Sequence, residues 1–306
     1  MQNEKTLETV LAGLMRRYSD RVPDVKKILR AMVDEKQIPA EDSVENDHIA
    51  FRTMGVSHLG IASLEKIFLH YGYVKREPYF FEQKKLNAFW YAPPKEHYPR
   101  IFISELRVEK LSETSQKIIH SYTDTVKADP VDSINLDDGE AVDRFLHSPL
   151  WHTPTWEDYE QLLKESEYAA WVVYNRYYLN HFTISVHNLK GEQGKLENFN
   201  TFLEKHGVVL NDSGGKIKAS PDGKLRQSST VAQMIQAEFP SIKGGVLNHT
   251  IAGSYVEFAE RCVLDEFANL PADQIKRIHR RDGFEAGNAD KIFESTFTSQ
   301  TKRKES

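Results

Sequence analysis

The stretch Asn46-Asp47-His48-Ile49-Ala50-Phe51-Arg52 recurs later in the chain as Leu179-Asn180-His181-Phe182-Thr183-Ile184-Ser185. Each copy places a histidine on an apolar, strand-like segment, and a helix end with a glycine turn follows about 20 residues further on. These turns are Phe68–Val74 and Phe202–Val208. A repeated strand–helix–turn unit predicts two structural modules whose matching positions face each other. His48 and His181 are then expected to converge on one point, and two imidazoles in a cleft indicate a metal site.

The residues that follow His48 predict a βαβββ unit, and therefore an α+β fold. In this first module, residues 46–107, a strand at His48–Thr53 and a helix at about Leu59–His70 precede three strand-like runs. Aromatic and β-branched residues, interrupted at Lys84-Lys85 and Pro93-Pro94, favour an antiparallel meander in these runs. The three runs are Tyr73–Phe81, Leu86–Tyr91 and Arg100–Leu106.

The second module, residues 179–262, is expected to repeat this order. It begins at Asn180 and ends with a strand at Gly253–Arg261. A long Gly- and Ser-rich stretch, Asn211–Gly223, lies within it. Because the two modules share one order of elements, we expect them to enclose a single cleft.

Helical segments are expected around and between the two modules. Residues 1–40 carry apolar side chains at i, i+3, i+4 and i+7 in two runs, which predicts two amphipathic helices joined near Pro23. Residues 108–178 are polar and helical in pattern, and we interpret them as an insertion between the modules. Residues 263–306 form a C-terminal segment and tail. We expect a single catalytic domain over residues 1–306.

Composition and charge argue against several classes of protein. The chain has 306 residues and a formal net charge of −5, whereas a nucleic-acid surface needs clustered Lys and Arg, so no nucleic-acid partner is expected. No run of about 18 apolar residues could span a membrane, and the N-terminal residues lack the apolar stretch of a signal peptide. Cys262 is the single cysteine, so no intramolecular disulfide can form, which favours a reducing compartment. We expect a cytoplasmic protein that could form a homo-oligomer.

A third metal ligand should come from another strand that lines the same cleft. In the run Ser254–Arg261, an extended strand places Tyr255, Glu257 and Ala259 on one face. Glu257 is a carboxylate with apolar neighbours, which is costly unless the group is paired or bound to a metal. Two imidazoles and one carboxylate with three open positions form the facial triad of non-haem Fe(II) oxygenases. A 2-oxo acid can occupy two of these positions through its carboxylate and keto oxygens, and O₂ the third.

Three stretches of the chain resemble the signatures of the 2-oxoadipate dioxygenase/decarboxylase family: Asp47–Thr53, Asn180–Thr183 and Tyr255–Arg261. The resemblance covers nearly the whole chain and includes Gln227–Ala232 and Asp282–Asp290. It implies a fold of the vicinal-oxygen-chelate type, in which two βαβββ modules form a metal-holding cleft. It also implies an activity, the conversion of 2-oxoadipate and O₂ to 2-hydroxyglutarate and CO₂ in lysine breakdown.

The resemblance assigns roles to residues by their position. His48, His181 and Glu257 match the family's ligands for Fe²⁺. Arg52 matches the arginine that holds the substrate, and Gly287-Asn288 match a C-terminal segment that closes on it. Strand geometry supports the role of Arg52, because a residue four positions after His48 lies on the same face. A guanidinium there can bind the distal carboxylate of a dicarboxylate through two hydrogen bonds, and a structural salt bridge is the alternative.

Several other polar residues could contact the substrate or support the ligands: Gln227, Ser228, Ser229 and His249. The first three could instead cap a helix that follows them. His187 is a further candidate for a supporting role. Glu105 is expected to be the first-module counterpart of Glu257, which leaves a fourth protein ligand as an alternative.

We therefore expect an Fe(II)-dependent dioxygenase that decarboxylates a 2-oxo dicarboxylic acid with O₂. Two alternatives stay open. One is a glyoxalase- or epimerase-like metalloenzyme that does not use O₂. The other is a metal-free module that binds a small dicarboxylate, with His48 and His181 as hydrogen-bond donors. Metal content and O₂ uptake distinguish the three.

Overall fold

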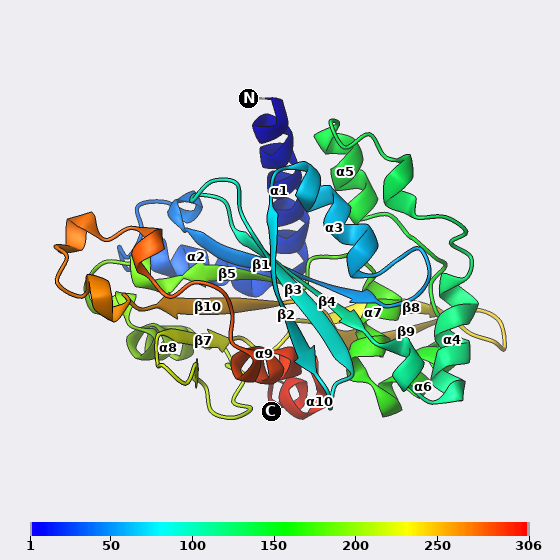
Figure 1. Ribbon diagram of the computed structural model, residues 1–306. Helices are drawn as coiled ribbons and strands as arrows, with labels where there is room; N and C mark the ends of the chain where they lie inside the picture. The colour runs from blue at the N-terminus through cyan, green and yellow to red at the C-terminus, as the bar shows by residue number, and fades with distance from the viewer. Residues whose placement is uncertain (1, 305–306) are drawn as a thin grey trace.

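The computed structural model describes residues 2–304 and is organised around one curled, eight-stranded sheet (Figure 1). The strands run in the order β2-β3-β4-β1-β5-β10-β7-β6 across it. Their bounds are β1 Asn46–Met54, β2 Val74–Phe81, β3 Leu86–Ala92, β4 Arg100–Leu106, β5 His181–Ser185, β6 Lys218–Ala219, β7 Leu225–Ser229 and β10 Tyr255–Arg261. The α+β fold expected from the sequence is confirmed.

The sheet consists of two similar halves that meet at β1 and β5. In each half the first strand pairs in parallel with the last, β1 with β4 and β5 with β10. β1 and β5 are antiparallel neighbours, and Ala50 lies opposite His181. Figure 1 shows this pair at the centre of the sheet. The repeat in the sequence therefore corresponds to a two-fold-like arrangement in which both histidines lie on adjacent central strands.

The helix of each half is capped by the matching carboxylate of that half. These helices are α3 (Ile61–His70) and α8 (Leu196–Lys205). Glu105 on β4 accepts a hydrogen bond from the Ile61 backbone N–H at 2.8 Å, and Glu260 on β10 accepts one from the Leu196 N–H at 3.0 Å. Both carboxylates lie at a helix N-terminus, where the unpaired N–H groups and the helix dipole favour a negative charge.

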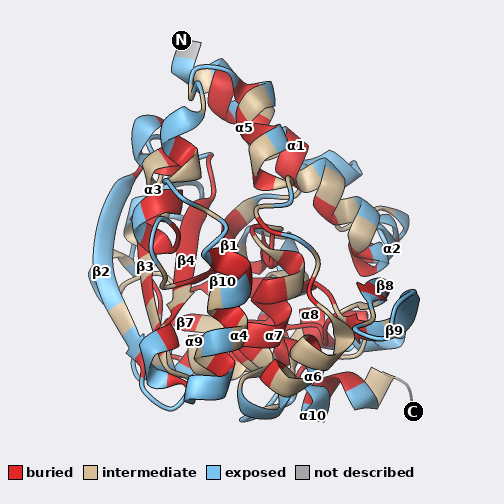
Figure 2. Ribbon diagram, turned by 90° about the vertical axis from the view of Figure 1, so that its right-hand side faces the viewer, coloured by how far each residue is buried: buried red, intermediate tan, exposed pale blue. Residues whose placement is uncertain are grey.

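Helices surround this sheet as the pattern of the sequence predicts. α1 (Gln2–Arg21) and α2 (Pro23–Asp34) form the N-terminal pair. Four helices follow between β4 and β5: α4 Glu113–Thr123, α5 Gly139–Leu146, α6 Trp156–Glu165 and α7 Glu167–Asn175. α5 packs along α1, where Arg17 and the buried Asp143 form an ion pair at 2.9 Å (Figure 2). Figure 2 also shows that β1 is buried while β2 is exposed along most of its length.

The second half of the sheet departs from the expected order of strands. A hairpin of β8 (Met234–Pro240) and β9 (Val246–Ala252) is inserted between β7 and β10, and it forms a separate two-stranded sheet. Its turn contains Gly244 and Gly245, with φ of 90° and 84°, a backbone conformation that glycine adopts without strain. The strand that corresponds to β2 is reduced to the two residues of β6, because the Gly- and Ser-rich stretch before it forms mostly turns.

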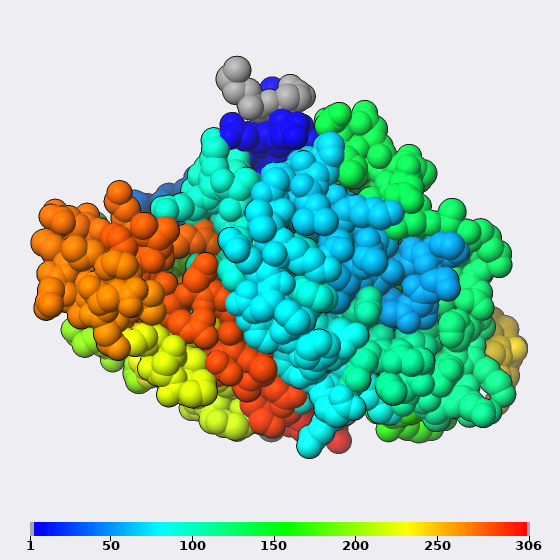
Figure 3. Space-filling view, viewed as in Figure 1, coloured from blue at the N-terminus to red at the C-terminus, as the bar shows by residue number. Residues whose placement is uncertain are grey.

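The C-terminal segment covers one side of the junction between the two halves. α9 (Ala286–Phe293) contacts β2, β6 and β7, and α10 (Thr298–Thr301) follows it. In Figure 3 this segment, orange to red, crosses the surface between the cyan strands of the first half and the yellow-green elements of the second. Among the helices that the structure describes, none combines the length and the apolar character needed to cross a membrane.

Candidate metal centre

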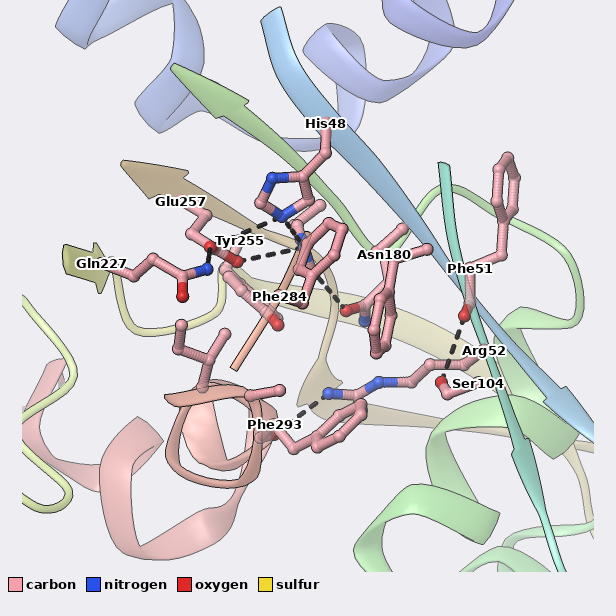
Figure 4. Close-up of a pocket in the computed structure, with 15 residues that line it drawn as sticks. His48, Phe51, Arg52, Ser104, Asn180, Gln227, Tyr255, Glu257, Phe284 and Phe293 are labelled. Atoms are coloured by element: carbon pink, nitrogen blue, oxygen red, sulfur yellow. Dashed lines mark hydrogen bonds and ion pairs between the residues drawn. The ribbon is translucent and has the colours of Figure 1, made fainter. Parts of the chain in front are cut away.

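Three strands bring His48, His181 and Glu257 together beneath the C-terminal segment (Figure 4). His48 lies on β1, His181 on the neighbouring β5 and Glu257 on β10, which pairs with β5. The Nε2 atoms of the two histidines are 3.3 Å apart. The carboxylate of Glu257 lies 3.5 Å from His48 Nε2 and 3.1 Å from His181 Nε2. All three residues are buried.

The distances between these atoms fit one metal ion. Ligand atoms about 2.1 Å from an ion are about 3.0 Å apart when they subtend a right angle and about 3.4 Å at the tetrahedral angle. The observed separations of 3.1 and 3.3 Å lie in this range, and the third, 3.5 Å, is slightly longer. The donor set and its geometry therefore fit a mononuclear metal site.

The residue before each histidine fixes the orientation of its ring. The Asp47 carboxylate is 2.8 Å from His48 Nδ1, and the Asn180 side-chain oxygen is 3.1 Å from His181 Nδ1. An acceptor at Nδ1 holds the proton there and leaves the Nε2 lone pair to bind a metal; in His48 this atom also lies 3.0 Å from the Thr183 hydroxyl. Asp47 and Asn180 are part of the repeated motif, but their roles were not predicted from the sequence.

Asp47 belongs to a buried network of charges. The Arg261 guanidinium donates two hydrogen bonds to its carboxylate, Nε at 2.6 Å and Nη2 at 2.9 Å, and Arg100 lies 3.3 Å away. Burial opposes ionisation of Asp47, but the two guanidinium groups outweigh it and hold its pKa well below the usual range. A carboxylate that stays ionised makes Asp47 a strong hydrogen-bond acceptor for His48.

The two histidines differ in how readily they take up a proton. Burial disfavours the charged form of His48, but the Glu257 and Asp47 carboxylates outweigh this and raise its pKa. The pKa of His181 is well below the ordinary value because the ring is buried and the positive charges of His48 and Arg52 oppose its protonation. His181 is therefore neutral, as a metal ligand must be, and His48 must release a proton where it is charged before it can bind a metal.

Gln227 and Asn288 support the third ligand from behind. The Gln227 side-chain amide donates a hydrogen bond of 2.6 Å to Glu257 Oε1. Asn288 on α9 in turn donates to the Gln227 side-chain oxygen at 2.9 Å and to the Leu225 carbonyl at 3.2 Å. Asn288 does not line the cavity, so its contact with the site passes through Gln227. Gly287 is exposed and does not line the cavity.

A hollow of ≈ 350 Å³, including its part open to solvent, lies next to the three ligands. Its walls are largely apolar, and the C-terminal segment contributes Phe284, Ala289, Ile292 and Phe293. The Phe284 ring packs edge-on against His48, with centroids 4.8 Å apart. The C-terminal segment therefore forms one wall of the hollow.

Arg52 lines the same hollow as His48, and its charge has no acidic partner within residues 2–304. The side chain is 1% exposed. Its guanidinium donates to Thr296 Oγ1 at 2.9 Å and to the Phe293 carbonyl at 3.0 Å, while Nε has no partner. The rings of Tyr168, Trp171 and Phe293 surround it at 5.1–5.6 Å. The structural salt bridge that the sequence left open is not formed in this part of the chain.

Three of the other predicted candidates lie outside the cavity. The Ser228 hydroxyl donates to the Asn200 side chain at 2.7 Å, and the Ser229 hydroxyl pairs with that of Ser295 at 2.9 Å. His249 stacks on Trp156, with ring centroids 3.5 Å apart, on the separate hairpin. None of the three lines the cavity.

His187 also lies outside the cavity. Its Nδ1 accepts a hydrogen bond from the Arg261 backbone N–H at 3.2 Å, so it supports the strand that carries Arg261 and contacts none of the ligands directly.

The expectation that Glu105 corresponds to Glu257 is wrong. His48 and Arg100 are paired in the first half as His181 and Tyr255 are in the second, so the register places Phe102 at the position of Glu257. Glu105 corresponds to Glu260, and both cap helices. Within the described residues the site has one carboxylate ligand, and the aromatic ring of Phe102 occupies the matching position.

Comparisons with known proteins identify the family. A model of the 2-oxoadipate dioxygenase/decarboxylase family matches residues 10–274. The chain belongs to this family. It is 43% identical over 314 residues to the chloroplastic 2-oxoadipate dioxygenase/decarboxylase of Arabidopsis thaliana. This alignment covers 98% of this chain and 80% of that protein.

Solved structures agree with the family assignment. The crystal structure of the hydroxyglutarate synthase from Oryza sativa in complex with 2-oxoadipate matches with a TM-score of 0.87 and 42% identity, over 98% of this chain and 95% of that one. A putative glyoxalase superfamily protein from Ralstonia eutropha has the same fold, with a TM-score of 0.68 and 22% identity over 90% of this chain and 84% of that one. The fold of the vicinal-oxygen-chelate type is thus confirmed.

Proposed function

We propose that this protein is an Fe(II)-dependent dioxygenase that converts 2-oxoadipate and O₂ to 2-hydroxyglutarate and CO₂. The observation that carries the proposal is the placement of a two-histidine, one-carboxylate triad in the same cavity as a buried arginine without an acidic partner. The names of the relatives from Arabidopsis thaliana and Oryza sativa support the substrate and the reaction. Atoms balance, because loss of C1 as CO₂ and uptake of both oxygen atoms convert a six-carbon 2-oxo diacid to a five-carbon 2-hydroxy diacid.

His48, His181 and Glu257 would hold the iron and leave the remaining positions open toward the cavity. When bound there, Fe(II) supplies the one-electron chemistry that O₂ activation needs, and side chains alone cannot supply it. Asp47 and Asn180 keep both imidazoles in the orientation and tautomer that present Nε2 to the ion. Gln227 holds the Glu257 carboxylate in place by its hydrogen bond.

The remaining residues of the cavity bind and shield the substrate. Arg52 is placed to pair with the carboxylate at the far end of a dicarboxylic 2-oxo acid, which would neutralise its buried charge. The apolar side chains of Phe102, Phe284, Ile292 and Phe293 exclude water from the reacting end. The C-terminal segment, which the family resemblance predicts to close on the substrate, contributes Phe284, Ile292 and Phe293 to this wall.

Oxygen consumption by the iron-loaded protein tests the proposal. We expect one O₂ consumed, one CO₂ released and one 2-hydroxyglutarate formed for each 2-oxoadipate, and no O₂ uptake by the zinc-loaded protein, because zinc does not change its oxidation state. Conversion of 2-oxoadipate without O₂ uptake would replace the proposal with a glyoxalase- or epimerase-like reaction. Binding without any conversion, independent of metal, would leave a dicarboxylate-binding module.

The cellular context belongs to the same proposal. A role in lysine breakdown is implied by the family's activity, and a reducing, cytoplasmic location is supported by the single cysteine, Cys262. We also expect that the protein could form a homo-oligomer. Fractionation of the source cells and sedimentation of the purified protein will test location and oligomeric state.

A further inference from the structure

A second cavity lies at the edge of the sheet where β1 and β4 begin and β5 and β10 end. It has a volume of ≈ 760 Å³, including its part open to solvent. One wall comes from residues 262–282, the segment after β10 that is drawn in orange in Figure 1. Among the described residues, none lines both this cavity and the one beside the metal ligands. The second cavity is therefore a separate place in the fold.

Positive charge is concentrated in the second cavity, although the protein as a whole carries a net charge of −5. Five side chains of Arg and Lys line it against three carboxylates. Arg100 and Arg261 are buried and pair with the buried Asp47. The other three cations form no ion pair within the described residues; they are Lys276, Arg277 and Arg280. A cleft lined mainly by charges of one sign attracts ions of the opposite sign.

Backbone carbonyls hold two of these unpaired arginines in place. Arg277 Nη1 donates to the carbonyls of Glu96 and Tyr98, the latter at 2.9 Å, while its buried Nη2 has no partner in the described structure. Arg280 Nη1 donates to the Arg261 carbonyl at 2.8 Å. A carbonyl fixes the position of a guanidinium group but does not neutralise its charge. An anion that enters the cavity therefore meets donors that are already positioned, which lowers the entropy lost on binding.

The composition of the wall indicates the chemical class of the ligand. Guanidinium groups bind the oxygen atoms of phosphates and carboxylates through paired N–H donors. The five cations exceed the three carboxylates by two charges, so an anion with two negative charges neutralises the excess. The two carboxylates other than Asp47 belong to the exposed Glu45 and Glu96. They disfavour a ligand with a single charge, which gains too little from the arginines to offset their repulsion.

Arg261 connects the second cavity to the metal centre by two routes. Its Nε and Nη2 donate to Asp47, whose carboxylate orients His48. Its Nη1 donates to the Gly283 carbonyl at 2.8 Å, and the next residue, Phe284, packs against the His48 ring. The positive charges around Asp47 oppose the binding of a divalent cation to His48, and an anion in the second cavity offsets them. Metal and anion are therefore expected to strengthen each other's binding by the same factor.

We infer that the second cavity is an effector site for a small oxyanion with two or more negative charges, whose binding strengthens metal binding by His48, His181 and Glu257. A phosphate monoester and a polycarboxylate share this chemistry. The inference goes beyond the proposed function and does not depend on it, because neither the 2-oxo acid nor turnover enters the argument.

Calorimetric titration of the metal-free protein at constant ionic strength tests the site. Methyl phosphate and tricarballylate represent the two sources of the oxyanion. Methanesulfonate has the shape of methyl phosphate but a single charge, and at about pH 8 the phosphate monoester carries two. We expect at least one of the first two probes to bind at one site per chain, about 10-fold or more tightly than methanesulfonate. The probe that binds more tightly identifies the source.

Substitutions in the wall locate the bound anion. Arg280→Gln should weaken probe binding by about 10-fold or more, because it removes a charged donor. Lys276→Gln should weaken it by about threefold or more, and because Lys276 is exposed, this variant keeps the fold. Arg30→Gln is the matched control, since it removes the same charge from an exposed position on α2 outside the cavity, and it should leave the affinity unchanged. Arg52→Met should also leave it unchanged, because Arg52 lines only the cavity beside the metal ligands.

The effect on the metal centre is measured by titrating the zinc-loaded protein with the same probe. We expect the zinc-loaded protein to bind the probe about fivefold or more tightly than the metal-free protein. This gain should be absent in Arg280→Gln and present in Arg52→Met, which distinguishes an anion in the second cavity from one bound directly to zinc.

Several results would overturn the inference. One is no saturable binding of either probe, or equal binding of methanesulfonate. Another is probe binding that both Arg280→Gln and Lys276→Gln leave unchanged, or that Arg52→Met abolishes, because the anion would then lie elsewhere. Equal affinity of the probe for the zinc-loaded and metal-free proteins would overturn the effector role. None of these results bears on whether the iron-loaded protein consumes O₂ with 2-oxoadipate.

Discussion

Replacement of Arg52 by Met should leave the ligand-free protein as stable as the wild type or more stable, although Arg52 is one of the largest fully buried side chains. The comparison is with Arg261→Met. Both arginines are 1% exposed, but Arg261 makes two short hydrogen bonds to the Asp47 carboxylate, whereas Arg52 has uncharged partners, namely hydrogen-bond acceptors and aromatic rings. The two variants therefore remove a paired and an unpaired buried charge.

The structure gives the sign and the size of each effect. Loss of Arg261 leaves the buried Asp47 with Arg100 alone, at 3.3 Å, and breaking a buried ion pair typically costs about 3–5 kcal/mol. Loss of Arg52 does not leave the Phe293 carbonyl without a hydrogen-bond partner, because this carbonyl still accepts from Thr296 Oγ1 at 3.3 Å. The variant loses two hydrogen bonds from a charged donor. It also removes the desolvation cost of a buried, unpaired guanidinium, which is several kcal/mol and opposes folding of the wild-type protein. Met has a similar volume, so we expect a change in unfolding free energy between zero and about +2 kcal/mol.

Urea unfolding followed by circular dichroism, with metal removed by chelation, measures both effects under the same conditions. The two variants should unfold in a single transition with the wild-type slope, so that midpoints can be compared directly. In the zinc-loaded protein, Arg52→Met should also weaken 2-oxoadipate binding by about 2–5 kcal/mol and leave zinc content unchanged. A loss of stability in Arg52→Met as large as that in Arg261→Met would refute the reasoning. It would mean that the charge of Arg52 is compensated by the protein itself, and the argument for an anionic ligand would fail.

Four further predictions concern the ligands, their supports and pH. His181→Ala should lose metal while keeping the fold, because two remaining ligands hold an ion poorly; elemental analysis showing stoichiometric iron would exclude this residue from the site. Gln227→Ala should weaken metal binding by about 10- to 100-fold, since it frees the Glu257 carboxylate; competition with a chelator measures this, and wild-type affinity would contradict it. Glu105→Ala should cost about 1 kcal/mol in urea unfolding by removing the cap of α3, with metal content unchanged; a loss of metal would restore Glu105 as a ligand. Burial lowers the pKa of His187 from 6.5 to about 4, so between these pH values the unfolded chain binds more protons than the folded one and stability falls as the pH is lowered. His187→Gln should reduce that fall by up to about 3 kcal/mol between pH 7 and pH 4, and an unchanged pH profile would argue against a buried neutral imidazole.

The metal triad could be predicted from the sequence because its signals are local. Each histidine begins an apolar strand, and the repeated helix and glycine turn show that the two strands have equivalent places in the fold. Alternation along a strand put Glu257 among apolar neighbours, where an isolated carboxylate is unfavourable. These are short-range patterns. The local structure that they predict is kept in the folded protein, because backbone sterics and side-chain alternation do not depend on the rest of the chain.

The counterpart of Glu257 could not be predicted in the same way. Glu105 has a suitable side chain and a plausible place on its strand, but the pairing of β1 with β4 puts Phe102 at the matching position. The chain between these two strands passes through α3, β2 and β3, so their register depends on the packing of all three elements, and a shift by one residue exchanges the two faces of a strand. The β8–β9 hairpin was missed for a related reason, since its alternating pattern suits any half-exposed strand and does not reveal in which sheet it pairs.

The two modules, the three ligands and the arginine on the face of His48 could be predicted from the sequence, because they depend on a repeat along the chain and on alternation within single strands. The pairing of the buried charges follows from the tertiary structure: Arg52 has no carboxylate partner within residues 2–304, whereas Asp47 accepts two hydrogen bonds from Arg261. Whether a buried group has a partner depends on every segment that packs around it, and here those segments are distant in the chain: β1, β5, β10 and the residues of α9. The lack of a partner is thus a property of the assembled cavity, which no local pattern of residues contains.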